Sequence, residues 1–222
     1  MRLRRKPWID EAIHEYDSHV ILENHEAHKG KWREMFEDPT KPLYFELGTG
    51  KGRFIAGMAE THPEANFVGF EVQLGVLYYA AQKIFERNLP NAKVSLFDIA
   101  GIEDVVAPEE IDRFYINFCD PWPKARHAKR RLTYRTFLDR YARLLKPQGE
   151  IHFKTDNEGL FLFSLEEFKE CGWTLKNVTY DLHSTDTPNV MTEYEEKFSK
   201  KDSRFSAWKQ LNLRRRNYGA KG

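Results

Sequence analysis

Two short segments of this 222-residue chain have residue types and spacings suited to binding a small charged molecule beside a planar ring. The first holds three alternating glycines, Gly48, Gly50 and Gly52, directly after an apolar run that contains Glu46. The second, about 70 residues further on, is Asp120-Pro121-Trp122-Pro123. Both follow predicted strands. A parallel sheet would bring them to one edge, where such sheets bind ligands.

The glycine loop can turn tightly and let its backbone approach a ligand closely. It departs from both common phosphate-binding patterns. A dinucleotide fingerprint needs a small residue where Arg53 stands, and a Walker loop needs Ser or Thr after its Lys, whereas Gly52 follows Lys51. Glu46 also disfavours a phosphate and favours a cationic group such as an ammonium. We therefore predict a nucleoside cofactor here; the alternative is a glycine-rich turn without a ligand.

Two further acids end the next predicted strands. Glu71 stands about 20 residues after the loop, where a carboxylate reaches ribose hydroxyls in nucleoside-binding sheets. Asp98 ends the following strand, where it could accept a hydrogen bond from an adenine amino group. Each acid could instead cap the helix that follows it.

The second segment fixes a carboxylate and an indole by means of two prolines. An aromatic face beside a fixed acceptor suits a base taken out of its stack. The alternative is a stiff loop with a core tryptophan. Residues 124–131 then carry basic side chains and no acid, which predicts phosphate contacts to RNA rather than a merely solvated surface. His127 has no partner at metal-ligand spacing, so we expect it to contact a phosphate or base, and we expect no metal site.

Strand-like and helix-like segments alternate from Leu43 onward, which predicts a parallel sheet built from right-handed crossovers. Expected strands cover residues 43–47, 66–71, 93–97, 113–118 and 149–155. Expected helices cover residues 52–61, 73–88, 133–145 and 157–171. After Gly172, two extended segments at 174–181 and 204–211 predict a hairpin added to one sheet edge.

Residues 1–40 are polar and begin with basic side chains, so we expect an arm that docks on the domain or becomes ordered on a partner. Residues 41–222 are expected to form one domain. With 41% apolar and 14% aromatic residues, its core needs no disulfide or metal. The net charge is only +1, but basic residues cluster at the start, at 124–131 and at 214–216. This local field favours a nucleic-acid partner despite the small total.

The two cysteines are typical of a reduced compartment rather than of a disulfide scaffold. No apolar run approaches the length that spans a membrane, and the basic start is not followed by an apolar stretch typical of a signal peptide. We therefore expect a cytoplasmic protein without a membrane partner, either a monomer or a homodimer.

Several motifs follow one another in a particular order: Glu46-Leu47-Gly48-Thr49-Gly50-Lys51-Gly52, Gly69-Phe70-Glu71, Asp98, Asp120-Pro121-Trp122-Pro123-Lys124 with the basic run, Lys154-Thr155-Asp156, and Thr192-Glu193-Tyr194-Glu195. Over nearly the whole chain this order resembles the TrmB family, the bacterial tRNA (guanine-N7-)-methyltransferases. The proline-tryptophan turn with its basic run is the specific part. The family often has Ser before the catalytic Asp and Ile before the second acid, where this chain has Cys119 and Phe70.

The resemblance implies a Rossmann-like class I methyltransferase domain at 41–222: an α/β sheet, mostly parallel with an antiparallel C-terminal strand, and helices on both faces. It implies S-adenosylmethionine as cofactor, held by Glu46, Glu71, Asp98 and Asp120, with Asp120 also catalytic. The implied substrate contacts are Lys124, Asp156, Thr192, Glu193, Tyr194 and Glu195. The implied RNA contacts are Arg126, His127, Ala128, Lys129, Arg130 and Arg131, and the implied target is guanine 46 of the tRNA variable loop.

Three other functions remain open on the residues alone. A dehydrogenase could use the same architecture, although Arg53 weakens that reading. A non-catalytic RNA-binding protein would bind tRNA without transferring a methyl group. A methyltransferase for an exocyclic amine or a protein could use the Asp-Pro turn to accept from an amino group.

Overall fold

The computed structural model describes residues 6–180, 189–199 and 209–214. The chain forms two compact units. Unit 1 comprises residues 1–107 together with 190–196, and unit 2 comprises residues 108–189 together with 197–222. The segment 190–196 thus belongs to the first unit, although the residues before and after it belong to the second.

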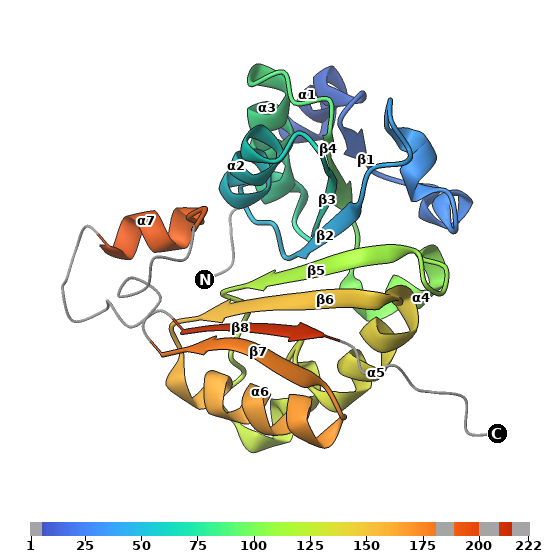
Figure 1. Cartoon of the computed structure of the whole chain (residues 1–222). Helices are drawn as coiled ribbons and strands as arrows, with labels where there is room; N and C mark the ends of the chain where they lie inside the picture. The colour runs from blue at the N-terminus through green and yellow to red at the C-terminus, as the bar shows by residue number, and fades with distance from the viewer. Residues whose placement is uncertain (1–5, 181–188, 200–208, 215–222) are drawn as a thin grey trace. The chain divides into compact units, whose positions relative to one another are not determined.

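Unit 1 is built on a parallel sheet (Figure 1). Its strands lie in the order β1-β4-β3-β2 and span Val20–Ile21 (β1), Leu43–Leu47 (β2), Asn66–Glu71 (β3) and Ala92–Leu96 (β4). Leu43 pairs with Asn66, and Phe67 pairs with Ala92. The strands predicted at 43–47 and 66–71 are confirmed, and β4 begins and ends one residue earlier than predicted.

The longer helices of unit 1 follow β2 and β3 and pack through apolar faces. They are α2 (Arg53–Thr61) and α3 (Leu74–Glu86), and the short elements are α1 (Ile9–Ala12), α4 (Ile102–Val105), and the 3-10 turns η1 (Ile13–Tyr16), η2 (His25–His28), η3 (Trp32–Met35) and η4 (Ile99–Gly101). Helix α2 lies close to β3 because Gly69 has no side chain: a Cβ there would be 2.9 Å from Ile55 Cδ1.

The other face of this sheet is covered by residues from the N-terminal region. Trp32 is fully buried, its indole donates to the Val105 carbonyl at 2.7 Å, and it packs edge-on against Phe45 and Phe70. Phe70 points away from the α2 side because neighbouring side chains alternate along a strand and Gly69 faces α2. Part of the 1–40 region is therefore core of unit 1. The basic residues at 2, 4 and 5 lie outside the described residues.

Unit 2 contains strands in the order β5-β6-β8-β7, namely Ile111–Asn117 (β5), Leu145–Thr155 (β6), Thr174–Thr179 (β7) and Lys209–Arg214 (β8). Strand β5 is parallel to β6, and β8 is antiparallel to both β6 and β7 (Figure 1). Its helices are α5 (Arg135–Leu144) and α6 (Glu158–Glu170), with the 3-10 turn η5 (Ala125–Arg130). The helix α7 (Glu193–Ser199) begins in unit 1.

Strand β6 begins at Leu145, four residues before the predicted start. Pro147 and Gly149 interrupt the apolar pattern there, and the pairing with β5 shifts register between Ile111 and Arg113. Of the predicted tail hairpin, Asp181 and residues 204–208 lie outside the described residues, whereas β8 extends to Arg214. The core of unit 2 is aromatic, with fully buried rings at Phe114, Tyr141, Phe153, Phe161 and Phe168.

Candidate active site in two parts

The glycine loop after β2 adopts the conformation that its glycines permit. Gly48, Gly50 and Gly52 have φ values of 85°, 58° and 77°, in the left-handed region that strains other residues. A Cβ on Gly52 would lie 2.6 Å from the Cβ of Ala80, so this glycine also lets α3 approach. At Gly48 and Gly50 a Cβ would meet nothing within 4 Å. Open space therefore lies beside the first two glycines.

Glu46 is buried at the end of β2, with 3% of its surface exposed. Its Oε2 accepts a hydrogen bond of 2.6 Å from the Thr49 hydroxyl. The amides of Gly48 and Thr49 both donate to the Phe70 carbonyl, which fixes the loop against β3. A carboxylate is thus held beneath the loop, where it favours a cationic ligand group.

Glu71 ties the end of β3 to the glycine loop. Its Oε2 accepts from the Gly50 amide at 3.2 Å, and its Oε1 accepts from the amides of Val72 and Gln73 at 2.9 and 3.1 Å. A carboxylate offers about four acceptor positions, and three backbone amides occupy some of those of Glu71. The acid expected to bind a ribose therefore also organises the loop.

Asp98 is exposed after β4, and its Oδ1 accepts from the Ala100 amide at 2.9 Å. It is the N-cap of the turn η4, which is the alternative role that the sequence left open for this acid.

In unit 2, the segment after β5 holds Asp120 at the surface of a strained turn. Phe118 and Trp122 have φ values of 50° and 40°, which is uncommon for residues with side chains. The Phe118 amide donates to the Lys154 carbonyl of β6 at 2.9 Å. The guanidinium of Arg131 donates to the carbonyls of Pro121 and Trp122 at 3.1 and 3.0 Å. The turn is held by this arginine as well as by its prolines.

Two side chains of the basic run contact the indole of Trp122 in that turn. Residues 125–130 form η5, and exposed cations are carried by Lys124, Arg126, Lys129 and Arg130. The Arg130 guanidinium lies 4.8 Å from the Trp122 ring centroid, and the half-buried His127 meets the same ring edge-on at 5.8 Å. Ala128 is half-buried as well. Arg131 differs from the others because it stacks on Phe163 at 4.2 Å and supports the turn.

The end of β6 supplies further polar groups. Asp156 is half-buried, and the next residue, Asn157, caps α6 by accepting from the Leu160 amide at 2.8 Å. Lys154 is 6% exposed, and its ammonium donates to Asn189 Oδ1 at 2.5 Å. We did not predict a role for Lys154. The sequence feature that could have indicated a role for Lys154 is the presence of a lysine at an inward position of an otherwise apolar strand.

Residues 192–195 form a reciprocal helix cap. The Thr192 amide donates to Glu195 Oε2 at 2.7 Å, and the Glu195 amide donates to Thr192 Oγ1 at 3.1 Å. Both side chains are buried, whereas Tyr194 is exposed. Glu193 accepts from the amide of Arg53, the residue after the glycine loop. Neither Arg53 nor this attachment was predicted as part of the site.

Unit 1 thus brings Glu46, the glycine loop, Glu71 and residues 192–195 into one connected set of hydrogen bonds and neighbours. Asp98 follows the neighbouring parallel strand. In unit 2, Asp120, the basic run and Asp156 follow two paired parallel strands, with Asn117 opposite Lys154. Among residues 6–180, 189–199 and 209–214, no group of three or more His, Cys, Asp or Glu side chains could hold a metal ion. No helix in that part of the chain is both long and apolar enough to cross a membrane.

Comparison with known sequences gives close relatives. Residues 40–207 match the profile of a family described as putative methyltransferase. The tRNA (guanine-N(7)-)-methyltransferase of Streptococcus agalactiae serotype III is 48% identical over 202 residues, which cover 90% of this chain and 95% of that protein. The enzyme of the same description from Geobacillus sp. (strain WCH70) is 49% identical over 205 residues, covering 92% of each chain.

Solved structures with similar folds are also methyltransferases. The 30S ribosomal A1408 methyltransferase from an uncultured bacterium has a TM-score of 0.60 at 17% identity, covering 86% of this chain and 93% of that chain. An antibiotic-related methyltransferase has a TM-score of 0.56 at 18% identity, covering 81% and 87%. At such low identity these matches show the fold alone, which is Rossmann-like and of the class I methyltransferase type, as the sequence predicts.

Proposed function

This chain belongs to the TrmB family of tRNA (guanine-N7-)-methyltransferases, and we propose that it transfers a methyl group from S-adenosylmethionine to N7 of guanine 46 in the tRNA variable loop. It is a cofactor-dependent enzyme whose substrate is tRNA, acting in the cytoplasm as a monomer or homodimer. The observation that carries the proposal is the 48% identity to such an enzyme over 90% of this chain. The matched residues 40–207 include both the glycine loop and the Asp120 turn.

The residues of unit 1 fit S-adenosylmethionine. The space beside Gly48 and Gly50 admits a ligand close to the backbone, and the buried carboxylate of Glu46 suits the ammonium of its amino-acid part. Glu71 would bind the ribose hydroxyls, and Asp98 would accept from the adenine amino group. When bound, S-adenosylmethionine supplies a methyl group on a sulfonium that an electron pair can attack.

The residues of unit 2 suit the guanine. Its N7 carries a lone pair and no proton, so the chain need not supply a general base, and catalysis can rest on positioning. The purine gains positive charge during methylation. The carboxylate of Asp120 or Asp156 would stabilise that charge and would accept from the N1 and N2 donors.

The exposed cations of the basic run would contact phosphates and so position the RNA without reading its sequence. Lys124, Arg126, Lys129 and Arg130 are the candidates. Because the Arg130 guanidinium already lies over the Trp122 ring, a flipped base that stacks on this indole would share the ring with Arg130 or displace it.

Product analysis tests this function directly. Unmodified tRNA is incubated with methyl-labelled S-adenosylmethionine and the protein, then digested to nucleosides. We expect label only in N7-methylguanosine, and none when guanine 46 is replaced by adenine. Label on an exocyclic amine, or tRNA binding without transfer, would overturn the proposal.

A further inference from the structure

Helix α7 begins on unit 1, against the first turns of α2. Val190 lies so close to α2 that a Cβ on Gly57 would be 2.7 Å from its Cγ1. The glycine at position 57 therefore makes room for the segment that enters α7. This seating brings residues 192–195 to the helix that follows the glycine loop.

Glu193 attaches this segment to the loop through two donors. Its Oε1 accepts from the Arg53 amide at 3.0 Å and from the Lys83 ammonium at 2.5 Å. Lys83, on α3, donates also to the carbonyl of Lys51, within the glycine loop, at 2.6 Å. One ammonium thus joins the loop to the segment.

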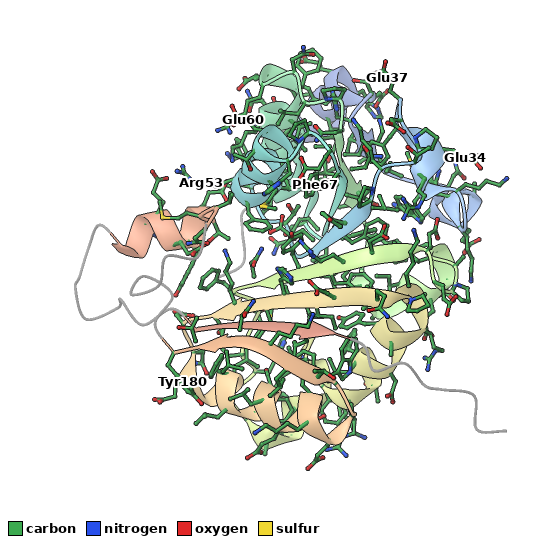
Figure 2. The ribbon with its side chains drawn as sticks, in the orientation of Figure 1. Glu34, Glu37, Arg53, Glu60, Phe67 and Tyr180 are labelled. Carbon is green, nitrogen blue, oxygen red and sulfur yellow. The ribbon has the colours of Figure 1, made fainter. Side chains whose placement is uncertain are left out.

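A second ion pair lies beside the first. The Arg53 guanidinium contacts Glu196 Oε2 at 2.6 Å, and Figure 2 shows Arg53 beside α7. In the first pair, side-chain exposure is 25% for Lys83 and 35% for Glu193. Solvent therefore screens the Lys83–Glu193 contact less than it screens a fully exposed pair. Arg53, which breaks the dinucleotide fingerprint, therefore has a definite partner on α7.

The internal conformation and the placement of residues 192–195 have separate causes. The reciprocal cap between Thr192 and Glu195 shapes the turn, and it uses only atoms of the segment itself. The bonds of Glu193 help to hold that turn against the glycine loop, together with the Arg53–Glu196 pair and the packing of Val190 on α2. A change at Lys83 should therefore loosen the attachment of the segment while the cap can still form.

We propose that Lys83 is a positioning residue that holds residues 192–195, which the family resemblance implies as substrate contacts, against the glycine loop. Binding of cofactor at the loop and binding of the tRNA substrate by the segment are thereby coupled, and the coupling acts equally in both directions. That substrate role of the segment rests on the proposed function. The attachment of the segment to the loop rests on the contacts of Lys83, Glu193 and Arg53.

The test compares Lys83→Met with Arg87→Met, a matched control at the residue that follows α3, which removes the exposed Arg87–Glu60 pair. Steady-state methylation gives kcat and the KM for tRNA. Amide hydrogen exchange, with and without S-adenosylmethionine, reports on residues 192–196, where the Glu196 amide donates to the Thr192 carbonyl. Glu193→Gln is a second variant, which keeps an acceptor for the Arg53 amide but removes the charge.

For Lys83→Met we expect the KM for tRNA to rise about tenfold with a smaller change in kcat, as for the loss of one charge-assisted hydrogen bond. In wild type and in Arg87→Met, cofactor should increase the protection of residues 192–196. In Lys83→Met and Glu193→Gln this increase should be lost.

If cofactor protects the segment equally in Lys83→Met and Arg87→Met, and the KM values agree, the positioning role is wrong. The exchange experiment needs no methyl transfer. A wild-type protein that fails to methylate tRNA but shows the cofactor-dependent protection would overturn the proposed function and leave the link between loop and segment supported.

Discussion

At the scale of single residues, the position of Asp120 depends on strain on either side of it. Phe118 and Trp122 both lie in the left-handed region, where a residue with a side chain costs about 1–3 kcal/mol. Such a conformation persists only where surrounding contacts over-determine it. The surface position of Asp120 is therefore held by the fold and does not result from a flexible loop.

Replacing Asp120 by Asn should lower the rate of methyl transfer by roughly tenfold to a thousandfold at saturating tRNA and cofactor, because one electrostatic contact to the transition state is lost. Asp120→Ala should lose most of the turnover. Single-turnover rates measure the effect, with Asp139→Asn, an exposed acid on α5, as the control. A full-rate Asn variant would restrict Asp120 to positioning the substrate.

Glu71→Ala should weaken binding of S-adenosylmethionine by roughly 1.5–3 kcal/mol and leave tRNA binding, measured without cofactor, nearly unchanged. Two causes combine, because Glu71 is the proposed ribose acceptor and also accepts from the Gly50 amide of the loop. Glu71→Gln, which keeps one acceptor oxygen, should lose less. Calorimetry measures both, with the exposed Glu64→Ala as control. Unchanged cofactor affinity in both Glu71 variants would remove Glu71 from the site.

At the scale of elements, the Asp120 turn and α6 are joined by Arg131. Its guanidinium bonds two carbonyls of the turn and stacks on Phe163 of α6. A lysine keeps the charge but cannot present the planar fork that makes both bonds and the stack. Arg131 is thus better explained as a support for the turn than as one more RNA contact.

Arg131→Lys should therefore lower kcat by about tenfold, the effect of losing one or two charge-assisted hydrogen bonds, while the salt dependence of tRNA binding stays as in wild type. Arg130→Lys is the control, because its guanidinium makes no such pair of bonds to the turn. A normal kcat in Arg131→Lys would mean that the paired bonds and the stack on Phe163 are not needed to support the turn.

Strands β5, β6 and β7 are linked by Glu150. Its hydrogen bond to His152, with Arg113 and Lys176 nearby, lowers the pKa of Glu150 from 4.5 to about 2. Burial lowers the pKa of His152, so that imidazole prefers to stay neutral in the folded protein. The pKa of Glu150 is lower in the folded state than in the unfolded state, so its carboxylate stabilises the fold fully at pH values above the unfolded-state pKa. This contribution is lost as the pH falls through the folded-state pKa.

Glu150→Gln should accordingly destabilise the protein by about 1–3 kcal/mol at pH 7, and its difference from wild type should shrink as the pH falls from 4.5 toward 2. Urea unfolding at several pH values measures this difference. Glu166→Gln, an exposed acid on α6, should show no such trend. A pH-independent difference would mean that Glu150 acts through packing alone.

At the scale of the whole molecule, a net charge of +1 conceals a strongly basic surface around η5. Association with RNA depends on this local field, because each neutralised phosphate releases counterions while distant charges are screened within about a Debye length. The small total charge is therefore compatible with tRNA as substrate.

Replacing Arg126 and Lys129 together with Ala should flatten the log-log salt dependence of tRNA affinity by up to about 1.8, since each lost phosphate contact contributes up to about 0.9. Cofactor affinity should persist. The control removes two exposed cations elsewhere in unit 2, Arg143 and Lys169. Equal slopes in the double variant and wild type would mean that the run is only a solvated surface.

What the sequence by itself determined is local. Alternation of apolar residues sufficed for β2 and β3, because strand periodicity needs only neighbouring residues. The glycine spacing likewise predicted a tight turn, since only glycine enters the left-handed region without strain. The ordered motifs of the acids and the proline-tryptophan turn indicated a methyltransferase through their resemblance to the TrmB family, because a family pattern is carried by residue types and their order.

Only the tertiary structure decided which partners those residues have. Glu193 meets Lys83 across 110 positions of sequence, and Arg131 meets Phe163 on another element. The capping box of residues 192–195 can be recognised as a sequence pattern, whereas the packing of the preceding Val190 beside Gly57 cannot. Periodicity and spacing describe neighbours along the chain, whereas these contacts require side-chain directions that exist only once the sheets and helices have packed.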